Sequence, residues 1–299
     1  MRVDRQGGTD SKMEVQSRRV LRLVEPRSVI EGAGVRLKRS IALPELDYVD
    51  PFLLFDHFGS DNPEDYNAGF PMHPHRGIET VTYVLAGKVT HRDSMGNEGT
   101  IGPGDVQWMT AGGGIMHEEM PGTQKGRMGG FQLWVNLPAK LKMMPPRYQE
   151  IAAAQIPEVE REDGTRIRII AGSVDGVQGP ITEIAADPTY LDVTIPPHGS
   201  FSHPVSRGHA SFAYLFEGKG LFVADLGEDR AVAHPHLVVF DDGDQVEVRA
   251  TDQGARLLLV SGKPLGEPIA RYGPFVMNTK EEIRQALRDL QNGTFVQSA

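Results

Sequence analysis

The chain contains no cysteine in its 299 residues. That absence excludes disulfide bonds, cysteine nucleophiles and thiolate zinc sites, so any metal must be held by histidine and carboxylate. No apolar run approaches the roughly 20 residues needed to cross a membrane. The first fifteen residues are charged and have no apolar core, so they do not read as a secretory signal. We therefore expect a cytoplasmic protein, or a nuclear one if the source is eukaryotic.

Positive charge is also in short supply. The net charge is -9 and the pI is near 5.6. Proteins that bind polyanions through a broad charged surface carry an excess of positive charge. We expect no direct nucleic-acid partner and no membrane partner.

Glycine and proline, by contrast, are plentiful, with 34 and 21 residues. They separate short runs rich in β-branched and aromatic residues, such as Glu79–Leu85, a pattern typical of many short strands joined by turns. The two halves also resemble each other. Tyr83–Lys88 matches Tyr214–Lys219, and the turn Gly104–Asp105 matches Gly243–Asp244. We interpret this repeat as one β-barrel unit used twice.

These features predict an all-β fold of two tandem barrels with a short C-terminal helix. We expect residues 1–16 to be a disordered tail, 17–145 the metal-binding barrel, and 146–299 a metal-free barrel that carries the helix. The proline-containing segment Pro138–Pro157 is the expected connector. The helix is predicted by a capping box at Thr279–Glu282, followed by apolar residues at helical spacing.

Two ligand-bearing motifs lie between Gly69 and Glu119. His73 and His75 are separated by one residue, as are His117 and Glu119. Residues two apart on a strand point to the same face, so each pair can aim both side chains at one point. Either pair alone is usually structural, but the motifs occur together, in order, around a β-rich run and a P-G-D turn. The pattern predicts one metal ion held by all four residues.

The residues alone leave the identity of the metal open. Three imidazoles and one carboxylate suit iron, zinc, nickel, cobalt, manganese or copper. Four protein ligands leave one or two positions free on a five- or six-coordinate ion, as catalysis requires. A fully ligated tetrahedral zinc without catalysis is the alternative.

The second half lacks a matching ligand set. His203 stands near the first ligand position, but the counterparts of the H-x-E pair, counted from the Gly-Asp turn, are Arg256 and Leu258. We therefore predict a metal-free second barrel. The tripeptide that contains His234 and His236 has no H-x-E partner downstream, and we interpret it as a surface turn.

Other residues near the motifs receive supporting roles. We expect Glu79 to be structural or to hydrogen-bond a ligand histidine. Strand alternation points Glu118 away from the metal. Arg76 is assigned to a surface salt bridge rather than to an anionic substrate, and Trp108 and Met109 to the core.

At these residues the chain resembles the pirin family of the cupin superfamily. The matching words, in order, are HPHRGIETVTYVL, PGDVQWMTAGGGIMHEEMP, FQLWVNLP and GPFVMNTKEEI, and they span Phe52 to Leu290. The resemblance implies two cupin barrels, or a bicupin. It also implies one iron in the first barrel, held at the positions His73, His75, His117 and Glu119.

The resemblance implies two functions. One is a quercetin 2,3-dioxygenase, which would take a flavonol and dioxygen as substrates. There the metal would polarise the flavonol 3-hydroxyl and Glu119 would accept its proton. The alternative is an iron-dependent regulatory protein that binds a transcription factor or a metabolic enzyme. We expect a monomer in either case.

Overall fold

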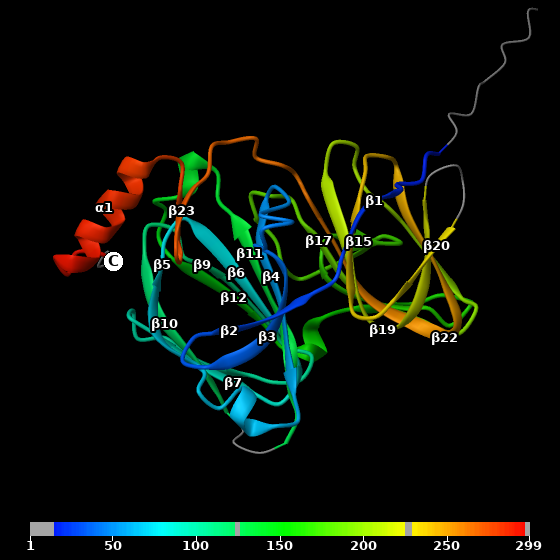
Figure 1. Cartoon of the computed structure of the whole chain (residues 1–299), viewed down its shortest axis with the longest axis horizontal. Helices are drawn as coiled ribbons and strands as arrows, with labels where there is room; N and C mark the ends of the chain where they lie inside the picture. The colour runs from blue at the N-terminus through cyan, green and yellow to red at the C-terminus, as the bar shows by residue number, and fades with distance from the viewer. Residues whose placement is uncertain (1–14, 123–125, 225–228, 297–299) are drawn as a thin grey trace, which may run out of the picture.

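The computed structural model describes residues 15–122, 126–224 and 229–296. Two antiparallel β-barrels lie side by side (Figure 1). The α-helix in the described part of the chain, α1 (Lys280–Gln291), lies at the outer end of the first barrel. The predicted all-β class with a terminal helix is confirmed. Most of the predicted disordered tail, residues 1–14, lies outside the described residues. Within the described ranges, no helix is both long and apolar enough to span a membrane.

The first barrel consists of two antiparallel sheets. The larger sheet has seven strands, in the order β12 (Arg147–Ile151), β9 (Val106–Thr110), β6 (Ile78–Ala86), β11 (Met128–Asn136), β4 (Phe52–Ser60), β3 (Val35–Ile41) and β2 (Arg27–Glu31). The smaller sheet has four strands, in the order β5 (Phe70–His75), β10 (Ile115–Pro121), β7 (Val89–Asp93) and β8 (Glu98–Ile101).

The second barrel is built from one nine-stranded sheet. Seven strands form its main path, in the order β1 (Val20–Val24), β21 (His236–Phe240), β19 (Ala210–Val223), β22 (Gln245–Gly262), β17 (Thr189–Ile195), β14 (Arg166–Ala171) and β13 (Glu158–Glu160). The other two strands are β18 (Ser200–Pro204), which pairs with β22, and β20 (Asp229–Ala233), which pairs with β19.

The remaining elements are short. They are the hairpins β15 (Ser173–Val174) with β16 (Val177–Gln178) and β23 (Ala270–Tyr272) with β24 (Phe275–Met277), the 3-10 turns η1 (Pro63–Asp65), η2 (Ala139–Leu141) and η3 (Ala153–Gln155), and the helix α1 (Lys280–Gln291).

Helix α1 begins where the capping box predicts. The Thr279 side chain accepts a hydrogen bond from the backbone N–H of Glu282, and the Glu282 carboxylate accepts one from the backbone N–H of Thr279. This reciprocal pair satisfies backbone donors that the first turn leaves free. Ile283 and Ala286 are buried and Leu287 is partly buried, so this part of the predicted apolar stripe faces the protein, whereas Leu290 at its end is exposed.

The two terminal segments cross between the barrels. β1 pairs with β21 in the second barrel, whereas β23, β24 and α1 lie against the first (Figure 1). Phe275 of β24 forms a β-bridge with Arg76, directly after β5. The sequence does not reveal this exchange, because no local pattern specifies which barrel a terminal strand joins.

A continuous apolar core joins the barrels. Phe55 of the first barrel lies 5.5 Å from Phe212 and 4.8 Å from Tyr214 of the second, measured between ring centroids. Such aromatic pairs each contribute about 1 kcal/mol beyond their buried area. Tyr83 also donates a hydrogen bond across the interface to Asp192, at 2.7 Å. The two barrels therefore share one core rather than meeting at a polar surface.

Strand pairing corrects the alignment of the two halves. The turn Gly104–Asp105 leads into β9, whereas Gly243–Asp244 leads into β22. The first part of β22 pairs with β18 and β19 as β10 pairs with β5 and β7, so it corresponds to β10. The repeated Gly-Asp turns therefore precede strands that are not equivalent.

The correction changes which residues stand opposite the ligand positions. His73 faces His117 across β5 and β10, and His203 faces Val246 across β18 and β22. The second-barrel counterpart of His117 is therefore Val246, and the assignment to Arg256 is wrong. Arg256 instead pairs with an aspartate in the interface between the barrels.

The same reasoning replaces Leu258 as the counterpart of Glu119. Glu119 pairs with His91 of β7, and Val248 pairs with Phe222 of β19. His91 and Phe222 each lie three residues after the lysine of the shared Gly-Lys turn. The counterpart of Glu119 is therefore Val248.

Candidate metal centre

Two neighbouring strands bring the predicted ligands together. His73 and His117 are directly opposite in the antiparallel pairing of β5 with β10, and His75 lies two residues further along β5. A bulge between His117 and Glu119 shifts the register, so that Glu119 faces Phe70. Bulges of this kind re-aim side chains next to functional sites.

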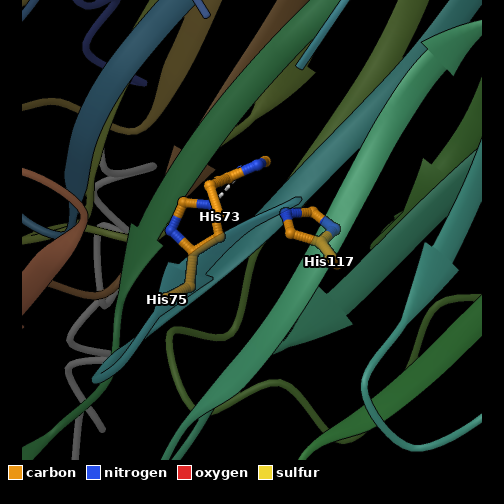
Figure 2. A group of neighbouring side chains, drawn as sticks. All are labelled: His73, His75 and His117. Carbon is orange, nitrogen blue, oxygen red and sulfur yellow. Dashed lines mark hydrogen bonds between the residues drawn. The ribbon is translucent and has the colours of Figure 1, made fainter. Parts of the chain in front are cut away.

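The three histidines form a compact group. Their ligand nitrogens all lie within 4.8 Å of one another. Figure 2 shows the His73 and His75 rings meeting from one strand and the His117 ring approaching from the next. The Nε2 atoms of His73 and His75 are 3.0 Å apart, and the ring centroids of His73 and His117 are 4.4 Å apart. His75 and His117 are buried, and His73 is partly buried.

The chemistry of this group fits a bound cation. Both ring nitrogens of His117 are buried without a hydrogen-bond partner among the described residues. Burial first, and then the neighbouring imidazoles, lowers the pKa of His117 and of His75 well below the ordinary histidine value. Neutral imidazoles whose lone pairs converge are the ligands that borderline divalent metals prefer. A metal would bind one nitrogen of each imidazole and would so supply a partner that the His117 ring lacks.

Glu119 lies beside the histidines but is held by a different contact. Its Oε1 accepts a hydrogen bond of 2.9 Å from the Thr82 hydroxyl, and its side chain lines the same cavity as His73 and His75. In the described part of the chain, the group of ligand atoms within 4.8 Å consists of the three histidines alone. The four-ligand set predicted from the sequence therefore stays a prediction.

Thr82 links Glu119 to a third polar residue. Its Oγ1 is 2.7 Å from Oε1 of Gln132. One hydroxyl proton cannot serve both oxygens, whereas the two ends of an amide are assigned from their surroundings. If the Gln132 amide presents its NH₂ to Thr82, the Thr82 proton is free for Glu119. Thr82 and Gln132 were missed from sequence; the one available signal was a polar residue in an apolar strand.

A cavity of about 550 Å³ opens beside the histidines. Its walls are mainly apolar, and they include Leu37, Leu54, Phe58, Phe70 and Trp134. The Trp134 ring meets the His75 ring edge to face, with centroids 5.1 Å apart. The space is large enough for a small planar ligand and places it next to the imidazoles.

Charged residues also line the cavity. Arg39 donates two hydrogen bonds of 2.8 Å to Asp56 and also pairs with Glu31 at 2.7 Å. Arg271 lies with its guanidinium carbon 5.1 Å from the centre of the Trp134 ring. Arg271 comes from β23, close to the end of the chain, so sequence proximity gives no signal of its presence here.

The structure also places the other predicted residues. The expected surface position of Arg76 is wrong: its side chain is 2% exposed, and it pairs with Asp289 of α1 at 2.6 Å. Glu79 accepts a hydrogen bond of 2.7 Å from Thr110 in the neighbouring strand, which is the structural role. Trp108 belongs to the core, as predicted.

Comparisons with known proteins agree with this architecture. A family model described as Pirin matches residues 34–135, and one described as Pirin C-terminal cupin domain matches residues 190–296. A pirin-like protein from Caulobacter vibrioides is 46% identical over 279 residues, which is 93% of this chain and 99% of that protein.

Solved structures also share this fold. A quercetin 2,3-dioxygenase from Acinetobacter baumannii superposes with a TM-score of 0.85 at 34% identity, over 94% of this chain and 99% of that one. A bacterial pirin from Escherichia coli, solved in complex with nickel(II), has a TM-score of 0.63 at 20% identity. That alignment covers 81% of this chain and 99% of the other, and it shows the fold alone.

Proposed function

The chain belongs to the pirin family of bicupins, and on that premise we propose that it is an iron-dependent quercetin 2,3-dioxygenase. The observation that carries the proposal is the three-histidine group, of which His73 and His75 line a mainly apolar cavity. The structural similarity to a quercetin 2,3-dioxygenase supports it. In this proposal, His73, His75, His117 and Glu119 hold one iron ion.

When bound, the metal supplies Lewis-acid polarisation of the flavonol 3-hydroxyl and a site for reaction with dioxygen. The chain's own residues do the rest. Oε1 of Glu119 accepts the Thr82 hydrogen bond and keeps a second lone pair with which it would bind the metal, which leaves Oε2 to accept the proton of the 3-hydroxyl. Thr82 keeps the carboxylate turned toward the cavity while that proton is held.

The cavity walls orient the substrate and limit the access of water. A flavonol is flat and largely apolar, and so are the surfaces offered by Phe58, Phe70 and Trp134. Trp134 already contacts His75, so a ring that packs along this wall brings its oxygen atoms to the histidine end. Exclusion of water protects the deprotonated flavonol from reprotonation.

The test is turnover of quercetin under oxygen by iron-loaded protein, followed by loss of flavonol absorbance and by release of carbon monoxide. Glu119→Ala should lower the rate by about 10² to 10⁴, the usual contribution of a positioned base. Glu118→Ala is the matched control, because Glu118 directly precedes Glu119 in the sequence but its carboxylate pairs with Arg92 at 2.7 Å. The control should retain the wild-type rate.

A wild-type rate no higher than that of Glu119→Ala, or of free iron, would contradict the enzymatic proposal. The regulatory alternative would then be tested by comparing partner binding by the ferrous and ferric forms. Equal affinity of the two forms would remove an iron-dependent switch.

A further inference from the structure

The C-terminal segment, residues 270–296, lies against the metal-binding barrel at the ends of both histidine strands. We call this segment the C-terminal clamp. It contains β23, β24, helix α1 and the residues that follow the helix. Figure 1 shows it on the outer side of the first barrel, although the chain has just left the second.

The first contact is with the end of β5. Arg76, the residue after His75, is 2% exposed and lies against the clamp. Its Nη1 pairs with Asp289 of α1 at 2.6 Å, and its guanidinium carbon lies 4.5 Å from the centre of the Phe295 ring. Its backbone carbonyl accepts a hydrogen bond of 3.1 Å from the N–H of Val276. A buried arginine is stable only with such partners, so this position depends on the clamp.

The second contact is with the turn that follows. Gly77 has a φ of +82°, and a Cβ there would lie 2.0 Å from the carbonyl oxygen of Val276. The buried ammonium of Lys142 donates to both carbonyls, at 2.9 Å to Gly77 and 2.8 Å to Val276. It also donates to the side-chain oxygen of Asn136 at 2.7 Å. Close packing and a bridging cation thus fix the clamp to this turn.

The third contact is with the start of β10, the other histidine strand. A Cβ on Gly114 would lie 2.5 Å from the carbonyl oxygen of Phe295. Met116, next to His117, packs on the apolar cluster that includes Phe295 and Ile283 of the clamp. The same segment therefore contacts the residues adjoining two ligands on two strands.

We propose that the C-terminal clamp is a positioning element for the metal site, which fixes the separation of His75 and His117 and acts through Arg76. The inference rests on the proposed metal site but not on the dioxygenase reaction. Arg76 is a positioning residue, because it acts through its neighbour. Outer residues that orient ligands commonly change metal affinity by about 10- to 100-fold when they are altered.

Cobalt(II) provides a readout that does not require turnover. We would load the full-length protein with Co(II), measure its affinity against a competing chelator, and record the d–d absorption that reports ligand geometry. Asp289→Ala should lower Co(II) affinity about 10-fold and change the absorption, and Asp289→Glu should restore part of both. Glu281→Ala is the matched control, since Glu281 is an acid of the same helix whose ion pairs with Arg284 and Arg288 lie on the exposed side of the helix. It should match the wild type.

Lys142→Met provides a second route if Asp289→Ala does not fold. It removes the ammonium between Gly77 and Val276 but keeps an apolar stem, and it should also lower Co(II) affinity. Wild-type affinity and absorption in both folded variants would overturn the proposal, even if their thermal stability falls. Failure of wild-type protein to bind Co(II) would overturn it as well. The variants could change Co(II) affinity and absorption as expected while the wild type does not turn over quercetin. That result would contradict the dioxygenase proposal and leave the clamp proposal standing.

Discussion

The two barrels carry different side chains at equivalent positions of one scaffold. Where the first has His73 and His117 facing each other across two strands, the second has His203 and Val246. The residue in the place of His75 is Val205, which lies two residues after His203 and donates a backbone hydrogen bond of 2.8 Å to the carbonyl of Asp244, directly before β22. Glu119 is replaced by Val248.

This difference distinguishes the residues that the barrel fold requires from those that the metal site requires. Val205, Val246 and Val248 are all buried and belong to the apolar core of the second barrel. The first barrel forms the same strands with buried histidine nitrogens that have no hydrogen-bond partner in the described part of the chain. Unpaired buried polar groups each cost about 1 to 3 kcal/mol. The first barrel thus tolerates a penalty that a bound metal would reduce, because each imidazole can give one nitrogen to the metal.

The largest expected effect comes from making the first barrel like the second. His117→Val removes one ligand and both of its unpaired nitrogens. We expect metal content to fall to background, while the metal-free protein becomes more stable by about 1 kcal/mol, the surplus over the small cavity created. Elemental analysis and urea denaturation of the metal-free forms measure the two quantities. Retained metal, or a less stable metal-free variant, would contradict the comparison.

The reverse substitution should be destructive without creating a site. Val246→His places an imidazole opposite His203 in a position that is 0% exposed. We expect the free energy of unfolding to fall by about 2 to 4 kcal/mol, because the larger side chain overpacks the core and buries an unpaired polar group. Metal content should stay at one ion per chain, because Val205 and Val248 provide no further ligands. Urea denaturation and elemental analysis test this, with Val246→Ile as the size control.

His203 should also leave a signature in the pH dependence of stability. Burial, and then Arg161, lowers its pKa to about 4. Between about pH 6.5 and 4 the unfolded chain binds a proton that the folded chain excludes, so folded stability falls as the pH is lowered through this window. His203 accounts for up to about 3 kcal/mol of that fall in stability.

His203→Leu isolates this contribution. The variant should lose less stability than the wild type between pH 6.5 and 4, measured by denaturation of the metal-free proteins. Burial lowers the pKa of His57 to about 4 as well, so part of the slope remains in both. Parallel curves for variant and wild type would show that His203 does not carry the effect.

Much of this architecture follows from local patterns. The alternation of a strand is enough to put His73 and His75 on one face, because side chains repeat every two residues. The capping box at Thr279 marks the start of the helix for an equally local reason. Neither inference needs knowledge of the rest of the fold.

What the sequence could not provide depends on long-range pairing. β1 pairs with β21, and Arg271 reaches the cavity from near the end of the chain. The repeated Gly-Asp turn gave the wrong counterpart, Arg256, because similar turns precede different strands in the two barrels. The burial of Arg76 was missed because its partner, Asp289, lies far along the chain.

The smallest expected effect tests strand alternation within the site itself. Glu118 lies between His117 and Glu119 but pairs with Arg92, whose side chain is 60% exposed. Exposed ion pairs contribute about 0 to 1 kcal/mol, because solvent screens them and ordering two long side chains costs entropy. Glu118→Ala should therefore lower stability by less than about 1 kcal/mol and leave metal content unchanged. Added salt should narrow even that difference, since screening weakens the wild-type pair. A loss of metal in Glu118→Ala would mean that the carboxylate reaches the histidine side of β10, and the assignment of Glu119 as the fourth ligand would have to be reconsidered.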